Sequence, residues 1–320
     1  MKNRKLLMGI AVIMVMVLCV GCSLGKKTWT VTCPWAPSGV AAMVNEKCAA
    51  LSEEMKLGIL LEAEAIKGHT ETVNTWIAET GSEDRKLVFG GEGFFPINKI
   101  LDPDSMNFDF EDFVFVENLY SSIFVMSAQS QLGISSIPAL EEYMKNVNKV
   151  TVATNGSHSS EAFLAAALFG AMGYGDKLEI IPYESAKEAA EAVGNGETDF
   201  AISHQSQILE TYQQIGVTIV CAFDDEDIKN GAFVGVEGIG KYGYPYFRNR
   251  CFILAPKGAE EEGIEKLREL YRSILSEEEM ESWLQNDLLL DVDFMTKEDA
   301  LEHIQQVEEI VNEYYDIVVK

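Results

Sequence analysis

Hydroxyl side chains occur in three short segments of this 320-residue chain, with glycine in the first two and with amide and imidazole side chains in the last two. The segments are residues 34–40 (PWAPSGV), 154–160 (TNGSHSS) and 203–206 (SHQS). Each follows an apolar stretch with strand character and precedes a helical pattern. Unpaired N–H groups at a helix start, with hydroxyl donors beside them, favour an anion such as a carboxylate. The three segments therefore predict the binding of a small anion.

The first segment combines a stiff turn with a glycine. Ser38 can cap the helix that follows, Gly39 lets backbone approach a ligand closely, and Trp35 could form a wall of the site. The alternative is an ordinary strand-to-helix turn with a buried tryptophan. The residue types alone do not separate the two interpretations.

The second segment is the densest in hydrogen-bond donors. Its histidine could donate to an oxyanion or form a wall, or it could be an ordinary solvated loop residue. The predicted ligand contacts and wall are Asn155, Gly156, Ser157, His158 and Ser159.

The third segment ends one strand and begins one helix. Ser203 is a predicted ligand contact and His204 a predicted wall, facing the first segment across a cleft. The alternative for Ser203 is a helix cap.

Motifs of other function classes are missing from the sequence. There is no GxSxG, no HExxH, no GxGxxG directly after a strand and no GxxxxGK[ST] segment, and the four histidines lack metal-ligand spacing. We therefore expect no enzyme activity, no cofactor and no metal site. The acidic run at residues 224–227 (DDED) predicts a solvated loop, and a net charge of -26 argues against nucleic acid as a partner.

The first residues read as an export signal. A basic start precedes the apolar run LLMGIAVIMVMVL, and Cys22 follows a small glycine, as in a bacterial lipobox. We expect residues 1–21 to be a lipoprotein signal peptide, Cys22 to carry lipid, and residues 22–27 to be a tether. The protein would then be exported and anchored at the outer face of the cytoplasmic membrane. The alternative is an uncleaved signal anchor.

Four further cysteines lie far apart in apolar stretches: Cys33, Cys48, Cys221 and Cys251. This pattern favours buried thiols over a disulfide framework or a zinc site. A single disulfide among the four is the alternative.

Strand and helix patterns alternate through most of the chain. Such alternation predicts α/β units with mostly parallel sheets flanked by helices. The chain is long enough for two compact units. The expected division is a first lobe of residues 28–126 with 248–320 and a second lobe of residues 127–247.

Five segments in order resemble the substrate-binding proteins of tripartite tricarboxylate transporters, the Bug family. These are the Pro-rich turn and helix at 31–55, the passage between lobes at 108–145, the Ser/Gly loop and Ala-rich helix at 150–173, the Pro-Tyr segment at 180–203, and the returning strand at 251–270. The resemblance covers nearly all of the chain after the signal.

The resemblance implies a two-lobed periplasmic-binding-protein fold and a small carboxylate held between opposing loops. It also implies lobe closure and delivery to the large and small membrane subunits of a permease, with a monomer as the default state. Ser203 stands where an acidic residue that faces the ligand is frequent, which argues against amino acids as ligands.

Two alternatives remain at this point. The protein could present its ligand to a signalling receptor instead of a permease. In a different class, it could be an exported hydrolase that uses a loop serine with His158 or His204.

Overall fold

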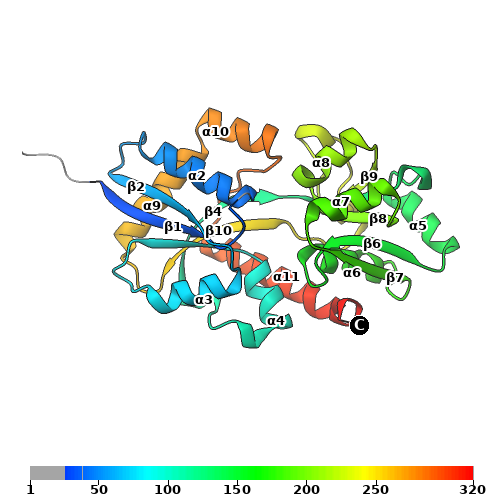
Figure 1. Cartoon of the computed structure of the whole chain (residues 1–320), viewed down its shortest axis with the longest axis horizontal. Helices are drawn as coiled ribbons and strands as arrows, with labels where there is room; N and C mark the ends of the chain where they lie inside the picture. Colours follow the sequence, from blue (N-terminus) through cyan, green and yellow to red (C-terminus); the bar gives the residue numbers. More distant parts are fainter. Residues whose placement is uncertain (1–25, 38, 320) are drawn as a thin grey trace, which may run out of the picture.

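The structure is a computed structural model that describes residues 26–37 and 39–319 (Figure 1). The predicted signal peptide, the lipidation candidate Cys22 and the ligand-contact candidate Ser38 lie outside these residues. Within the described part of the chain, no helix is both long and apolar enough to cross a membrane.

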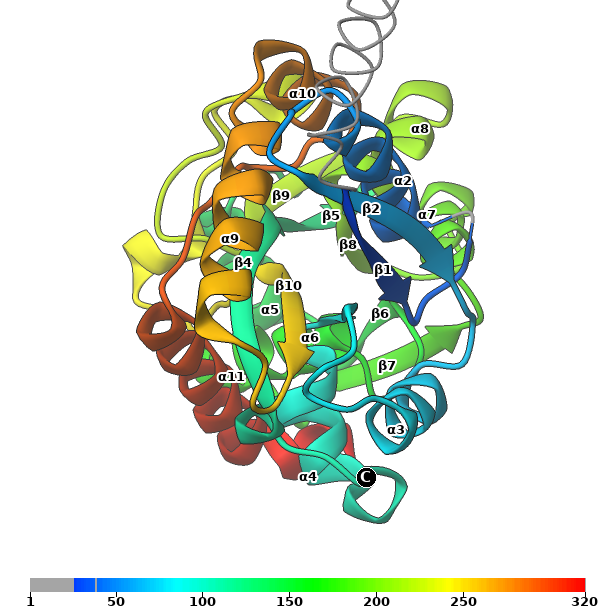
Figure 2. The same cartoon turned by 90° about the vertical axis from the view of Figure 1, so that its left-hand side faces the viewer.

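The first lobe is built on a five-stranded sheet with the order β2-β1-β3-β10-β4. Helices α2 and α9 cover one face of this sheet, and α3, η1 and the start of α11 cover the other (Figure 2). Its elements are β1 (Lys27–Cys33), α2 (Val40–Ser52), β2 (Ile59–Ala65), α3 (Thr70–Glu79), β3 (Lys86–Gly90), the π-helix η1 (Gly93–Asn98), α4 (Lys99–Leu101), the 3-10 turns η2 (Pro103–Ser105) and η3 (Phe110–Asp112), β4 (Phe113–Ser122), β10 (Asn249–Pro256), α9 (Glu261–Leu275), α10 (Glu278–Ser282), the π-helix η7 (Trp283–Asp287) and α11 (Lys297–Val318).

The second lobe repeats this plan with the strand order β7-β6-β8-β5-β9. Helices α5 and α6 and the end of α11 pack on one face, while α7 and α8 pack on the other. Its elements are β5 (Phe124–Ala128), the 3-10 turn η4 (Ser130–Leu132), α5 (Ile137–Asn146), β6 (Val150–Asn155), α6 (Ser160–Ala171), β7 (Leu178–Tyr183), α7 (Ala186–Asn195), β8 (Phe200–His204), α8 (Gln205–Gln214), β9 (Thr218–Ala222) and the 3-10 turns η5 (Gly231–Phe233) and η6 (Ile239–Tyr242).

Each sheet contains one strand that runs against the others. These are β5 in the second lobe and β10 in the first. Both are the strands by which the chain enters a lobe from the other one, so they approach the sheet from the opposite end. All other pairs are parallel, which confirms the predicted two-lobed α/β fold with mostly parallel sheets.

Three segments connect the lobes. The chain crosses at Ile123, between β4 and β5, and returns through the segment that leads into β10. Helix α11 forms the third connection, because Ala300 belongs to the core of the first lobe whereas Val307 and Val311 belong to the core of the second. The expected placement of residues 248–320 in the first lobe alone therefore does not describe α11, which packs on both.

Local sequence signals explain several helix starts. The predicted cap Ser136 accepts from the N–H of Ala139 at 3.4 Å. Ser185 accepts from the N–H of Glu188 at 3.2 Å, as its capping-box pattern predicts, although the Glu188 carboxylate binds the N–H of Glu184 instead.

The four cysteines of the described chain are free and buried, which confirms the prediction of buried thiols. Burial raises the pKa of Cys33 to about 11 and that of Cys48 to about 12. They are therefore protonated packing residues at neutral pH.

Candidate functional site

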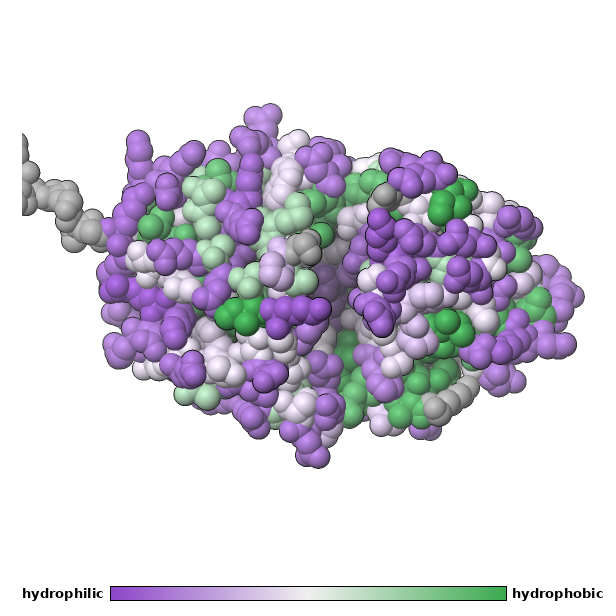
Figure 3. All heavy atoms as spheres, viewed as in Figure 1, coloured by the Kyte–Doolittle hydropathy of each residue, from purple (hydrophilic) through white to green (hydrophobic). Residues whose placement is uncertain are grey.

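The candidate site lies between the two lobes. The loops that follow β1, β3, β6 and β8 all reach the boundary between the lobes (Figure 1), and the surface is hollowed along this boundary (Figure 3). Ligands of open α/β sheets bind at such places, beyond the carboxyl ends of the strands. The three predicted segments are therefore brought to one cleft.

The first-lobe loop is held from two sides. The carbonyl of Pro34 accepts hydrogen bonds from the N–H groups of Gly68 at 3.4 Å and His69 at 2.9 Å, in the loop between β2 and α3. Trp35 stacks on Phe94, with ring centroids 5.7 Å apart. The partly buried indole thus packs on the core beside the cleft.

Among the described residues, which leave out Ser38, no side chain caps helix α2. Gly39 is its N-cap residue, with extended backbone, and its own N–H is donated to the carbonyl of Ala36 at 2.8 Å. No acidic side chain lies in the first turn of α2. The first free N–H groups of this helix remain for an anion.

The second-lobe loop is tightly closed. Gly156 has φ +91° and donates its N–H to the carbonyl of Tyr183 at 3.1 Å, while its own carbonyl accepts from the Thr154 hydroxyl at 2.8 Å. Ser159 caps α6 by accepting from the N–H of Ala162 at 3.3 Å. This geometry leaves Asn155, Ser157 and His158 exposed at the edge of the cleft.

The third segment lies deeper than expected. Ser203 is only 1% exposed, and its hydroxyl has no hydrogen-bond partner. His204 places Nδ1 at 2.9 Å from the Ser122 hydroxyl, and its ring lies 4.2 Å from that of Phe124. Ser203 therefore lies beneath the cleft surface, whereas His204 keeps part of its surface exposed.

Burial gives His204 a fixed charge state. It lowers the pKa of the imidazole to about 4, against a smaller opposing effect of the Glu92 carboxylate. The ring is therefore neutral at neutral pH. Its hydroxyl partner Ser122 is itself buried, and within the described residues this is the one serine that bonds to His204.

Two buried glutamates at the boundary were not among the predicted site residues. Glu92 follows β3 in the first lobe and is 1% exposed, and Glu161 is the second residue of α6 in the second lobe and is 4% exposed. The charge of Glu92 acts on both Glu161 and His204. Glu92 of the first lobe thus raises the pKa of two groups of the second lobe.

Glu92 is well supplied with donors. Asn249 Nδ2 donates to Oε1 at 2.5 Å, the N–H of Arg250 donates to Oε2 at 3.1 Å, and His303 Nε2 lies 3.9 Å from Oε2. Burial alone would raise its pKa, but these partners outweigh burial and hold the pKa of Glu92 below its usual value. It is a fixed negative charge.

Glu161 has few partners. Burial raises its pKa to about 7, and the charge of Glu92 adds to this rise. Its own backbone N–H and the Ser159 hydroxyl lower the pKa by less. In the described chain no Lys or Arg forms an ion pair with it. The Glu161 carboxyl therefore titrates near neutral pH.

Sequence signals for these glutamates were weak. Glu92 stands between glycines after an apolar strand (GGEG), which is a visible break in the pattern. Glu161 sits in a first helical turn, where an acidic residue is an ordinary partner of the helix dipole. Its burial depends on the second lobe facing the first.

His69 is a further residue that the sequence did not single out. It precedes α3 with φ +46°, an uncommon conformation for a residue with a side chain, and it donates to the first-lobe loop. Burial, with a smaller effect of Lys67, lowers its pKa. It holds the turn at 34–39 in place.

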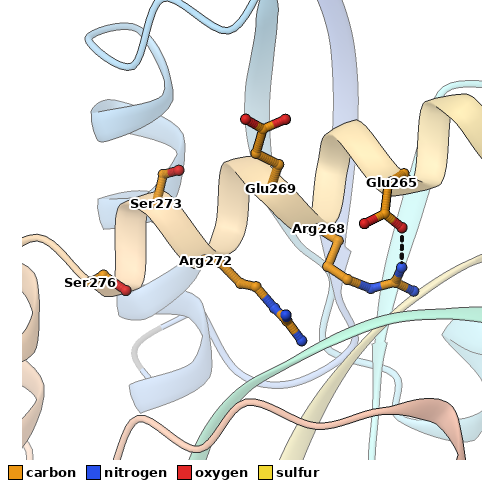
Figure 4. Close-up of a pocket in the computed structure, with 6 residues that line it drawn as sticks. All are labelled: Glu265, Arg268, Glu269, Arg272, Ser273 and Ser276. Atoms are coloured by element: carbon orange, nitrogen blue, oxygen red, sulfur yellow. Dashed lines mark hydrogen bonds and ion pairs between the residues drawn. The ribbon is translucent and has the colours of Figure 1, made fainter.

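Other hollows in the described chain have their charges already paired. One of about 470 Å³ lies on α9 (Figure 4), where Arg268 donates to carbonyls of the edge strand β4 and Arg272 pairs with the buried Glu117. It is lined by Glu265, Arg268, Glu269, Arg272, Ser273 and Ser276.

A crevice of about 240 Å³ lies at the interlobe crossings and includes Ile123 and Gln205. Here Arg248 binds both Asp224 and Asp291. The prediction of a solvated loop at 224–227 is wrong for Asp224, which is 2% exposed, while Asp225 and Glu226 are exposed. Burial raises the pKa of Asp224 to about 6, and the arginine partly offsets this. No His, Cys, Asp and Glu cluster in the described chain is arranged to hold a metal ion.

Comparison with known proteins gives a structural result. No family model and no curated sequence matches the chain. A ligand-free TctC solute-binding protein from Polaromonas superposes with a TM-score of 0.75 at 14% identity, over 91% of this chain and 100% of that one. The malate-bound MatC of Rhodopseudomonas palustris gives 0.68 at 20% identity, over 92% and 100%.

A second R. palustris protein, solved with adipate, gives a TM-score of 0.74 at 14% identity, over 92% of this chain and 98% of that one. At these identities the similarity shows the fold. The chain therefore has the two-lobed fold of periplasmic solute-binding proteins, as the five sequence segments implied.

Proposed function

We propose that this chain is a solute-binding protein of the tripartite tricarboxylate transporter type. It captures a small carboxylate between its lobes and delivers it to the large and small membrane subunits of a permease. The proposal is supported by the order of the five resembling segments and by a fold shared, across nearly the whole length, with TctC and MatC.

The observation that carries the proposal is the meeting of helix starts from two lobes at one cleft. Helix α2 offers the N–H groups that follow Gly39, and the loop before α6 offers the exposed side chains of Asn155 and Ser157. These are donors suited to one carboxylate, with Trp35 and His158 beside them. The structures solved with malate and adipate agree with a ligand of this class.

Lobe closure is the mechanism that follows from this placement. A carboxylate that binds α2 on one lobe and the 155–159 loop on the other has more contacts when the lobes approach, so it favours the closed state. The crossings at Ile123 and before β10 are the segments about which such a motion turns. The permease would then recognise the closed form.

A thermal-shift panel on the full chain in mild detergent tests the ligand class. Dicarboxylates, hydroxy acids, amino acids, aromatic acids and divalent metals are compared. A ligand at a hundred times its dissociation constant stabilises by about 2.7 kcal/mol, which gives a clear shift. Stabilisation by carboxylates supports the proposal, whereas a response to metals or uncharged amines alone contradicts it.

Calorimetric titration of a carboxylate hit then tests the site. Ser157→Ala should weaken binding about tenfold, since a hydrogen bond to a charged group contributes about 1.5–3 kcal/mol. The matched control is Ser276→Ala, at an exposed serine after α9 in the other lobe. Unchanged affinity in Ser157→Ala would reject this loop as the binding site.

The lipid anchor is a separate part of the proposal. Lipidation of Cys22 predicts that the wild type fractionates with membranes and incorporates a labelled fatty acid, whereas Cys22→Ala does neither. Labelling that persists in the variant would reject Cys22 as the anchor.

A further inference from the structure

A short segment of the first lobe reaches into the core of the second. Three consecutive leucines follow the π-helix η7, and all are buried: Leu288, Leu289 and Leu290. Leu288 and Leu290 belong to the core of the first lobe. Leu289, which is 6% exposed, belongs instead to the core cluster of the second lobe that includes Ile228 and Phe233. One leucine of the three therefore crosses the boundary between the lobes.

The backbone around Leu289 is held by the first lobe. The N–H of Leu290 donates to the carbonyl of Leu284 at 2.9 Å, and Asp291 and Ser121 of β4 exchange two backbone hydrogen bonds, each of 2.9 Å. Leu289 itself has φ +53°, in the left-handed region that a leucine rarely adopts. Such a conformation persists where the surrounding contacts determine it. The packing of the side chain across the boundary is a contact of this kind.

The second lobe has room for this side chain because of a glycine. Gly231 begins the 3-10 turn η5 with φ +77°. A Cβ atom at this position would lie 2.5 Å from Cδ2 of Leu289, which is closer than two carbon atoms can approach. The close packing between the lobes at this point therefore requires a glycine at position 231.

An ion pair connects the two lobes beside the leucine. Arg248, in the segment that returns to the first lobe, binds Asp224 of the second lobe and lies 3.3 Å, through Nη1, from Asp291 of the first. The crevice of about 240 Å³ lies next to these residues and is lined by Asp224 from the second lobe and by Gln285 and Leu289 from the first. This space lets the two walls move relative to each other once the contacts are lost.

We propose that residues 284–291 form a conformational latch: Leu289, with the Arg248 ion pair beside it, holds the lobes of the ligand-free chain at one relative angle. A contact made in one arrangement stabilises it relative to arrangements in which the contact is broken. The latch therefore limits lobe motion before a ligand binds. The inference rests on the proposed function only for its use in lobe closure, and its test needs no ligand.

Pulsed electron-electron distance measurements test the latch in the ligand-free full chain in mild detergent. Spin labels are attached through unnatural amino acids at the exposed positions of Glu46 in α2 and Gln213 in α8, so that the cysteines stay unchanged. These helices lie on opposite sides of the boundary (Figure 1). In Leu289→Ala the distribution of distances should be about twice as wide as in the wild type, because a cavity replaces the contact that fixes the angle.

The matched control is Leu288→Ala, at the adjacent leucine, which is 8% exposed and packs in the core of the first lobe. Its distribution should have the wild-type width. A Leu289→Ala distribution as narrow as that of the wild type, or equal widening in both variants, overturns the inference while the proposed function stands. If no carboxylate binds, the proposed function fails, and the width still decides on the latch.

A second variant covers the case in which Leu289→Ala does not fold. Arg248→Gln removes the ion pair with Asp224 and Asp291 and leaves the leucine in place. A wider distribution in Arg248→Gln than in the wild type supports the latch, and an unchanged width overturns it.

Discussion

The two buried glutamates at the lobe boundary occupy comparable places and have opposite properties. Glu92 follows the central strand β3 of one lobe, and Glu161 opens the helix after β6 of the other. The first has three nearby donors and a lowered pKa, whereas the second has a hydroxyl, its own N–H and a pKa raised to about 7. Equal burial therefore produces one permanent charge and one that titrates near neutrality.

The difference follows from the partners of the two acids. The partners of Glu92 come from β10 and α11, two of the elements that connect the lobes. The Ser159 hydroxyl and the N–H of Glu161 itself belong to one segment, so Glu161 makes no such connection. A buried acid with few partners lowers stability, because burial disfavours its charged form.

Removal of Glu92 is expected to have the largest effect. Glu92→Ala leaves the Asn249 amide and the Arg250 N–H without their acceptor and removes the carboxylate that lies 3.9 Å from His303 Nε2, so the free energy of unfolding should fall by about 3 kcal/mol or more in urea titrations. Glu92→Gln, which keeps an acceptor oxygen, should lose less. If Glu92→Ala were as stable as the wild type, the prediction that Glu92 stabilises the fold would be wrong.

Glu161 should show a dependence of stability on pH with a definite sign. Its pKa in the folded chain, about 7, lies above the usual 4.5, so the folded state binds the proton more tightly. The contribution of the Glu161 carboxyl to the free energy of unfolding is therefore fully present at low pH, and it is lost as the pH rises from 4.5 to 7. The stability of wild type minus that of Glu161→Gln should therefore fall by about 3 kcal/mol across this range.

If the difference in stability between wild type and Glu161→Gln did not change with pH, Glu161 would titrate at its usual pKa, and the predicted contrast with Glu92 would be wrong. Glu298→Gln, at an exposed glutamate in the corresponding position of α11, is the control, and its difference from wild type should not vary with pH.

His204 should show the opposite sign over an overlapping range. Its folded pKa of about 4 lies below the usual 6.5, so the unfolded state binds the proton more tightly. The stability of wild type minus that of His204→Gln should rise by about 3 kcal/mol from pH 4 to 6.5. In the wild type, the rise in stability that comes from His204 opposes the fall in stability that comes from Glu161 between pH 4.5 and 6.5. A difference that falls with pH would show that His204 is charged in the folded chain.

Local features of this molecule were predictable from sequence because their causes are local. The caps at Ser136 and Ser185 and the alternation of strand and helix depend on neighbouring residues and are found as predicted. The glycine turns at the cleft edge follow from the same rules. The two-lobed arrangement followed from alternation together with the family resemblance.

Features that depend on contacts between distant segments were not predictable in this way. The pattern of α11 shows an apolar face but not that its two halves pack on different lobes. Likewise, the approach of Glu92 to Glu161 requires the lobes to be placed first, and so does the burial of Asp224 against Arg248. A charged residue in a sequence is expected to lie at the surface. Which charged residues are buried instead depends on tertiary contacts, so it is seen only in the fold.

Ser159 is expected to give the smallest effect, and it connects the cap with the titrating acid. Ser159→Ala removes the acceptor for the Ala162 N–H, which should cost about 1 kcal/mol in urea titrations. The same hydroxyl lowers the pKa of Glu161, so the variant should also move the pH-dependent fall in stability to higher pH. Ser136→Ala is the matched control, since it removes the same type of cap from α5. It should lose a similar stability with no shift along the pH axis. A shift in both variants, or in neither, would show that Ser159 acts only as a cap and that Glu161 owes its properties to burial and Glu92 alone.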